Sequence, residues 1–221
     1  MRLSWVIAGW CVVACATGAR EYTVDHDKSV FAVVTHKEGV ASKLAHDHLV
    51  YPSSLKTTLE IPEDGFEKAA FSLSFNVTDL VADEPEAQRK WFPLIAEAKV
   101  LSEPFKAVGA KDRETVREHM LARNQLDAAA HPKISAKLLS VRKAEPDEKV
   151  YKFVARVALT VKGKTVERDC RASYAIEAAQ TVIEVHGKFK FTEFGIKPYS
   201  AFLGAVKNTD EFDVVAHIAA N

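Results

Sequence analysis

The 221-residue sequence lacks an excess of charge of either sign. Lysine plus arginine and aspartate plus glutamate each number 30, so the formal net charge is zero. Nucleic-acid binding usually shows as a basic excess or a basic face, and this balance supplies no excess. The sequence also contains no block of like charges that would indicate a binding tail. The composition therefore argues against a nucleic-acid partner.

Cysteine is scarce. Two of the three cysteines, Cys11 and Cys15, lie within the first 19 residues, which leaves Cys170 alone in the remainder. A single thiol cannot form an intramolecular disulfide, so the fold must hold without one. Cys170 lies in the alternating stretch VERDCRASYAI, which predicts a strand residue rather than a nucleophile.

Common catalytic motifs are absent as well. The sequence has no Gly-x-Ser-x-Gly, no His-Glu-x-x-His and no phosphate-binding loop. We therefore expect a binding protein rather than an enzyme. No linker, internal repeat or low-complexity stretch indicates a second domain.

The longest apolar run lies at the N-terminus. Arg2 precedes a largely apolar stretch to Ala16, followed by small residues, which is typical of a secretory signal peptide and too short for a membrane span. We predict a signal peptide over residues 1–19 and a periplasmic or secreted domain over residues 20–221. An alternative is that VVAC, ending at Cys15, resembles a bacterial lipobox, in which case a lipid on Cys15 would attach the protein to a membrane.

Residues after Arg20 alternate with a period of two, which is the pattern of β-strands. Turn signals such as PEDG and KGK separate the runs, and no β-α-β alternation occurs, so we predict an antiparallel all-β fold. So many strands must form a sandwich or close on themselves to protect their edges. The runs are SVFAVVTH, SSLKTTLEI, FSLSFNVTDLV, KISAKLLSV, YKFVARVALTV, VERDCRASYAI, TVIEVHGKFKF and FDVVAHIA.

One charge-rich segment near residues 84–123 has helical spacing instead. In DRETVREHML, Val116 and Met120 share one helix face, while Glu114 and Glu118 point towards solvent. We predict one or two helices inserted between strands.

Four stretches, in order, resemble the YceI-like family. They are YTVDHDKSVFAVVTHKEGV, VREHMLARNQLDAAAHPKISAKLLSV, VALTVKGKTVERDCRASY and FTEFGIKPYSAFLGAVKNTDEFDVVAHIAA. The resemblance implies an extended, lipocalin-like antiparallel β-barrel of about eight strands, usually exported. Some family members enclose an isoprenoid chain, such as a polyprenyl phosphate or a quinone tail. An isoprenoid lipid or quinone is thus the ligand that the resemblance implies.

Apolar side chains on the predicted inner face could bind such a chain by burial, or could pack against one another as a filled core. The filled core would suit a ligand-free envelope stress protein. The predicted lining residues are Phe31, Val33, Phe71, Leu73, Phe75, Phe153, Phe189, Phe191 and Phe202. The candidates for contacting a polar head group are the cations Arg117, Arg123 and Lys197.

The stretch THKEGVASKLAHDHLVY carries three histidines, His36, His46 and His48. If it forms a hairpin that turns near Val40 to Ser42, His36 lies opposite His46 and on the same face as His48. Three such imidazoles could hold a divalent metal ion, act as acid and base groups, or make structural hydrogen bonds. A register slip of one residue would turn His36 to the other face. Alternation also places His36 on the face opposite Phe31 and Val33.

Overall fold

The computed structural model describes residues 19–40, 46–177, 180–201, 203 and 205–221. Nearly all of the predicted signal peptide, Cys15 and Phe202 lie outside the described residues. Within them, neither helix is both long enough and apolar enough to cross a bilayer.

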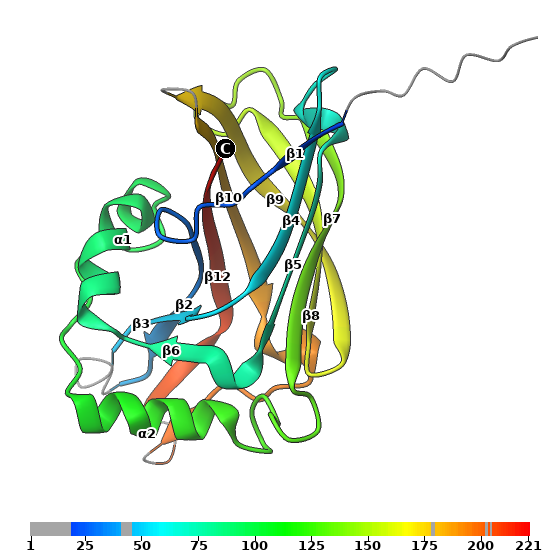
Figure 1. Cartoon of the computed structure of the whole chain (residues 1–221). Coiled ribbons are helices and arrows are strands. Elements are labelled where there is room, and N and C mark those ends of the chain that lie inside the picture. Colours follow the sequence, from blue (N-terminus) through cyan, green and yellow to red (C-terminus); the bar gives the residue numbers. More distant parts are fainter. Residues whose placement is uncertain (1–18, 41–45, 178–179, 202, 204) are drawn as a thin grey trace, which may run out of the picture.

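Antiparallel strands form a single curled sheet, which confirms the predicted all-β class (Figure 1). The strands pair in the order β1-β4-β5-β7-β8-β9-β10-β12-β2-β3-β6, and β11 lies beside β12. Their bounds are β1 Ala19–Tyr22, β2 Val30–Glu38, β3 His48–Pro52, β4 Lys56–Pro62, β5 Ala70–Asn76, β6 Leu80–Ala82, β7 Lys133–Lys143, β8 Phe153–Val161, β9 Lys164–Glu177, β10 Gln180–Lys190, β11 Ser200–Ala201 and β12 Val206–Ala220.

The sheet has twelve strands, whereas about eight were predicted. Bends in the chain account for much of the difference. Between Pro52 and Lys56 the chain leaves β3, which pairs with β2, and enters β4, which pairs with β5. The 3-10 turn Val77–Asp79 likewise separates β5 from β6, which pairs with β3. These changes of partner bring the two ends of the strand order towards each other and curl the sheet into a half-barrel.

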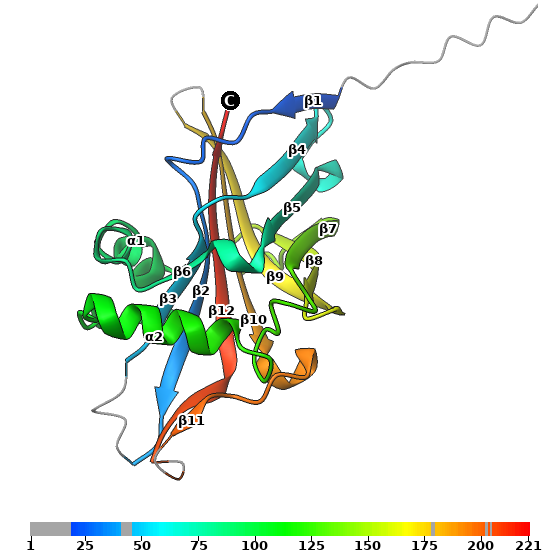
Figure 2. The ribbon, with the colours of Figure 1, turned by 60° about the horizontal axis from the view of Figure 1, so that its bottom comes forward.

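The two helices lie within the predicted segment 84–123. Helix α1 (Pro85–Glu97) begins where the Glu84 carboxylate accepts a hydrogen bond from the Ala87 N–H, with Pro85 in the first turn. Its buried Ile95 belongs to an apolar cluster with Val34 and Leu49, on the convex face of β2 and β3. Figures 1 and 2 show α1 on this flank of the sheet.

Helix α2 (Ala110–Leu121) lies across one end of the curled sheet (Figure 1). As predicted, Val116 and Met120 contact the interior apolar cluster, while Glu114 and Glu118 are exposed. The Arg117 guanidinium donates hydrogen bonds to the carbonyl oxygens of Thr78 (2.8 Å) and Leu80 (3.2 Å). These bonds attach α2 to the turn between β5 and β6.

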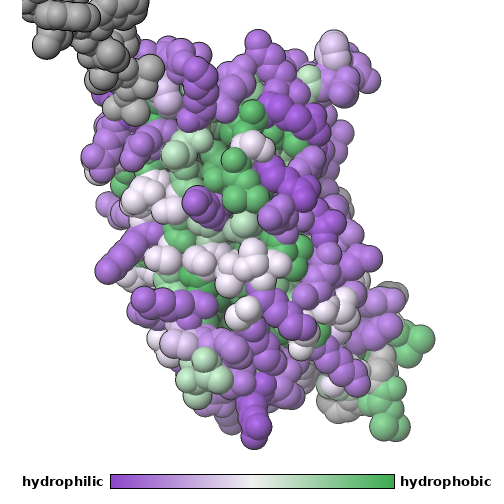
Figure 3. Space-filling view, turned by 90° about the vertical axis from the view of Figure 1, so that its right-hand side faces the viewer, coloured by the Kyte–Doolittle hydropathy of each residue, from purple (hydrophilic) through white to green (hydrophobic). Residues whose placement is uncertain are grey.

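Cross-strand ion pairs cover part of the convex face of β7, β8 and β9. Arg156 on β8 pairs with Asp169 (3.1 Å) and Glu167 (3.3 Å) on β9, and Arg142 on β7 also reaches Asp169 (3.4 Å). Figure 3 views the molecule from the side of β7 and β8, where hydrophilic residues border a central area of apolar and uncharged ones. The ion pairs lie on the outward-facing side of these strands, as the strand alternation requires.

Cys170 is a buried strand residue, 3% exposed. Burial raises the pKa of its thiol to about 12, so the thiol is not an activated nucleophile. Gly187 on β10 makes room for it, because a Cβ at position 187 would lie 2.3 Å from the Cys170 Sγ. Glycine is required at position 187 because the Cys170 side chain lies too close for any Cβ, not because of the backbone conformation.

Candidate functional site

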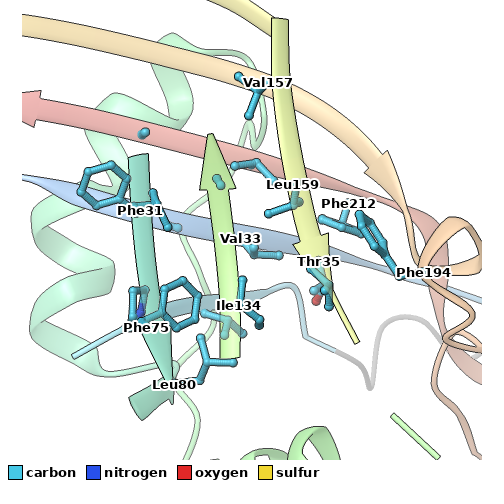
Figure 4. Close-up of a pocket in the computed structure, with 18 of the residues that line it drawn as sticks. Phe31, Val33, Thr35, Phe75, Leu80, Ile134, Val157, Leu159, Phe194 and Phe212 are labelled. Atoms are coloured by element: carbon cyan, nitrogen blue, oxygen red, sulfur yellow. The ribbon is translucent and has the colours of Figure 1, made fainter. Parts of the chain in front are cut away.

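The concave side of the sheet encloses a cavity of about 460 Å³ (Figure 4). This volume lies within the range of natural small-molecule sites. Alternation on each strand directs every second side chain into it: Phe31, Val33 and Thr35 from β2, and Val157 and Leu159 from β8. Because β-branched and aromatic residues favour strands and are also apolar, the same residues form the sheet and line the cavity.

The structure brings six of the nine predicted lining residues together around the cavity. They are Phe31, Val33, Phe71, Leu73, Phe75 and Phe191. Phe153 and Phe189 do not line it; they pack in the core, Phe153 edge-on against Phe66 (5.1 Å between ring centroids) and Phe189 stacked on Phe212 (6.1 Å). Phe202 lies outside the described residues.

Sequence reasoning missed the aliphatic part of the lining. The aliphatic residues of β8 and β12 that it did not name include Val157, Leu159, Val214, Ala216 and Ile218. The signal was present, because these positions share the inner face of their strands by the same alternation. The prediction named mainly phenylalanines and therefore left these aliphatic residues out.

Polar lining residues belong mostly to α2 or to segments near it. On α2, Asp112, Thr115 and His119 face the cavity, and the Tyr199 ring stacks on His119 with ring centroids 5.7 Å apart. The other polar lining residues are Thr35, His48, Gln125, Lys137 and Asn208. The cavity thus has apolar walls and a more polar end under α2.

The predicted head-group cations do not line this cavity. Arg117 attaches α2 to the β5–β6 turn, as described above. The main-chain oxygens of Arg123 and Lys197 accept hydrogen bonds from Lys162 and Gln125. Lys137 is part of the lining, but it is an exposed residue on β7.

The predicted hairpin register is wrong by one residue. Thr35, not His36, shares the face of His48, because Thr35 lies directly opposite His48 in the β2–β3 pairing. His48 therefore lines the cavity, whereas His36 lies on the convex face and bonds Asp213. His46 is near His48, with ring centroids 6.3 Å apart. The structure does not bring the three imidazoles together, and no group of three metal-ligating side chains is found among the described residues.

A buried polar network lies on the convex face instead. Asp213 on β12 is 1% exposed and accepts hydrogen bonds from His186 Nε2 (2.5 Å) and His36 Nε2 (2.6 Å). Arg171 donates to His186 Nδ1 (2.5 Å), which fixes the ring proton of His186 on the nitrogen facing Asp213. Burial alone would raise the pKa of Asp213, but these bonds and the nearby Lys188 charge hold it well below its ordinary value. This network is separate from the cavity.

Comparisons with known proteins agree with this architecture. A model of the YceI-like domain matches residues 22–220, whereas no curated protein matches the chain. The structure of Burkholderia cenocepacia BcnA is similar with a TM-score of 0.61 at 13% identity, covering 90% of this chain and 100% of that one. A polyisoprenoid binding domain from Saccharophagus degradans, implicated in plant cell wall breakdown, is similar with a TM-score of 0.53 at 7% identity, covering 92% and 99%.

Identities this low relate the folds only. The family model carries more weight because it spans nearly all of the described chain, from the end of β1 to the end of β12. The resemblance noted in the sequence is thereby confirmed, and this chain belongs to the YceI-like domain family.

Proposed function

We propose that this chain is an exported binding protein that encloses the apolar chain of an isoprenoid or quinone-type lipid. The observation that supports this most is the apolar cavity of about 460 Å³ on the concave side of the sheet. The description of the similar Saccharophagus degradans domain as polyisoprenoid binding supports the class of ligand. The role is sequestration of the lipid, not its chemical conversion.

Burial of the lipid chain supplies the binding free energy in this proposal. Each CH₂ group removed from water contributes about 0.8 kcal/mol, so about ten buried groups contribute ~8 kcal/mol before the cost of ordering the chain. The aromatic and branched walls provide this burial without a specific polar contact along most of their length. The ligand is therefore recognised mainly by its apolar chain.

Export is the second part of the proposal, and it rests on the signal-peptide features of residues 1–19. A lipid carrier in the periplasm or outside the cell would keep an insoluble chain dispersed in water. Processing at Cys15 with lipid attachment is the alternative form, in which the same cavity would stay at a membrane.

Filling the cavity tests the binding part. Val157 points into the cavity, whereas Val154 on the same strand does not line it (Figure 4). We expect native mass spectrometry and organic extraction to find a co-purified lipid in the wild type and in Val154→Phe. In Val157→Phe the lipid content should fall about tenfold, because overpacking a filled site costs roughly 1–3 kcal/mol.

Thermal unfolding of both variants controls for loss of fold. The binding proposal fails if repeated wild-type preparations carry no lipid and an added farnesyl or quinone lipid does not bind. It also fails if Val157→Phe and Val154→Phe retain the same amount of lipid.

A further inference from the structure

One polar atom in the cavity wall has no partner. Thr35 on β2 is 7% exposed and lines the cavity, and its hydroxyl oxygen is buried without a hydrogen-bond partner among the described residues (Figure 4). Buried hydroxyl groups are nearly always paired, because an unpaired one forfeits its hydrogen bonds to water. An unpaired hydroxyl on a residue that lines an apolar cavity therefore points to a partner supplied by a ligand.

His48 lies directly opposite Thr35, also facing the cavity. Its Nδ1 lies 2.5 Å from Oδ2 of Asp83, which is fully buried. The other oxygen of Asp83 already accepts hydrogen bonds from the Leu49 N–H (2.9 Å) and the Gln88 side-chain amide (3.0 Å). A carboxylate that accepts hydrogen bonds from two N–H groups is ionised and acts as an acceptor. Nδ1 of His48 therefore carries the ring proton and donates a hydrogen bond to Asp83.

This arrangement determines what the rest of the His48 ring can do. When the ring is neutral and its proton is on Nδ1, Nε2 is an acceptor. Within the described part of the chain, Nε2 of His48 makes no hydrogen bond. Asp83 itself sits at a positive φ of 55° and is anchored by three hydrogen bonds, so it holds the imidazole in a defined orientation.

The pair thus offers a hydroxyl and a ring acceptor side by side. Cβ atoms of residues directly opposite in an antiparallel pair lie about 4.5–5.5 Å apart, so a single ligand oxygen can reach both side chains. A ligand hydroxyl matches both at once: its O–H donates to Nε2 of His48, and its oxygen accepts from the Thr35 hydroxyl. An ether oxygen or a hydrocarbon cannot make both bonds.

Charge disfavours a phosphate at this position. Asp83 stands directly behind His48, and Asp112 lines the cavity from α2. Among the described lining residues Lys137 is the one lysine or arginine, and it is an exposed residue of β7, which does not pair with β2 or β3. A phosphate group beside His48 would therefore lie close to the Asp83 carboxylate without a paired cation.

We propose that Thr35 and His48 form a polar subsite that takes the hydroxyl group of the enclosed lipid, which makes a prenol or a hydroquinone the preferred ligand class. The inference rests on the proposed function, because it specifies the head group of the same lipid. It also gives His48 a binding role that involves no metal.

Three ligands with one shared chain test this subsite: farnesol, farnesyl methyl ether and farnesyl phosphate. Calorimetric titration of the delipidated protein should show farnesol binding about tenfold more tightly than either of the others, since an unmatched polar group typically costs that much. Thr35→Val keeps the side-chain shape and removes the hydroxyl. We expect it to weaken the binding of farnesol and of the methyl ether about tenfold each, because the oxygen of either ligand can accept from the Thr35 hydroxyl.

Thr160→Val, at a half-buried β8 position that does not line the cavity, is the matched control and should bind farnesol and the methyl ether as tightly as the wild type does. His48→Phe is the second variant: it removes the ring acceptor that only the farnesol O–H uses, so it should abolish the preference for farnesol over the methyl ether. Equal binding of all three ligands by the wild type, tighter binding of the phosphate, unchanged farnesol affinity in Thr35→Val, or an unchanged farnesol preference in His48→Phe would overturn the subsite and leave the proposed function standing. If none of the three ligands binds, both proposals fail.

Discussion

Histidines on the two faces of the β2–β3 pair have different environments and different roles. His48, on the concave face, lines the cavity, whereas His36, on the convex face, takes part in the Asp213 network. The network puts one carboxylate, 1% exposed, among two imidazoles and a lysine. A buried carboxylate with this many partners is costly to leave unpaired, so we assign the network to stability.

Asp213→Asn should make this contribution measurable. We expect the variant to lose about 3 kcal/mol of unfolding free energy at pH 7, because it breaks a buried hydrogen-bonded charge pair. The pKa of Asp213 is lowered in the folded protein, so its contribution is fully present above its ordinary value of 3.8 and is lost as pH falls below that value. Urea unfolding between pH 7 and pH 3 should show the gap between wild type and variant narrowing as the pH drops.

Asp169→Asn is the matched control, since this carboxylate is 47% exposed and its ion pairs are solvated. Its effect at pH 7 should stay within ~1 kcal/mol. A gap between wild type and Asp213→Asn that stays constant down to pH 3 would contradict the assigned role.

Single residues also show where sequence reasoning ends. Phe31 and Phe75 could be placed in the cavity from the sequence, because apolar residues alternate with polar or smaller ones along each of their strands. The unpaired hydroxyl of Thr35 could not, since whether a hydroxyl finds a partner depends on neighbours from other strands. Phe153 and Phe189 share the inner face yet pack in the core, because their neighbours Phe66 and Phe212 occupy the space beside them.

At the scale of elements, each of the eight alternating runs corresponds to observed strand, and the helical segment contains both helices. The register of the β2–β3 pair was predicted wrongly. The length and type of the turn determine this register, whereas the alternation of side chains is the same whichever face of the strand points inward. The bends at Pro52 and Val77 were not predicted either. They depend on which partner each half of the strand finds, which is a property of the whole sheet.

Helix α2 has few apolar contacts of its own, and none of its residues is fully buried. Arg117 is therefore expected to contribute much of its attachment, through the carbonyl oxygens of Thr78 and Leu80. Arg117→Ala should lower the protection of α2 backbone amides in hydrogen exchange by about tenfold, since hydrogen bonds to a charged group contribute ~1.5–3 kcal/mol. The amides of β8 should be unaffected.

Lys111→Ala, an exposed substitution on the same helix, serves as the comparison and should leave exchange in α2 unchanged. Equal protection of α2 in Arg117→Ala and Lys111→Ala would show that the helix is held by its apolar contacts instead.

For the molecule as a whole, the fold class was predictable because composition, alternation and resemblance agreed. The hollow interior was not. A filled core and a cavity use the same residue types at the same alternating positions, and only the curvature of the sheet decides how far opposite walls stand apart. The partner changes at Pro52 and Val77 produce that curvature, so the cavity follows from features that the sequence pattern does not reveal.

The cellular location is also a property of the whole chain. With ordinary secretion, the chain expressed with residues 1–19 in a bacterial host should appear in the soluble periplasmic fraction. Mass spectrometry should then find an N-terminus at Thr17 or Arg20. Cys15→Ser should leave this distribution unchanged. An uncleaved chain in the cytoplasm would contradict export, and a shift of the protein from the membrane fraction to the soluble one in Cys15→Ser would show that the wild type is lipid-anchored.

The contact between Cys170 and Gly187 has a consequence for the history of this chain. The sulfur of one residue occupies the space that any side chain at the other would need. Selection therefore acts on the combined volume at the two positions, and neither residue can be exchanged freely while the other stays. A lineage can enlarge residue 187 only after, or together with, a reduction at residue 170, so the order in which substitutions arise is constrained by a single buried contact.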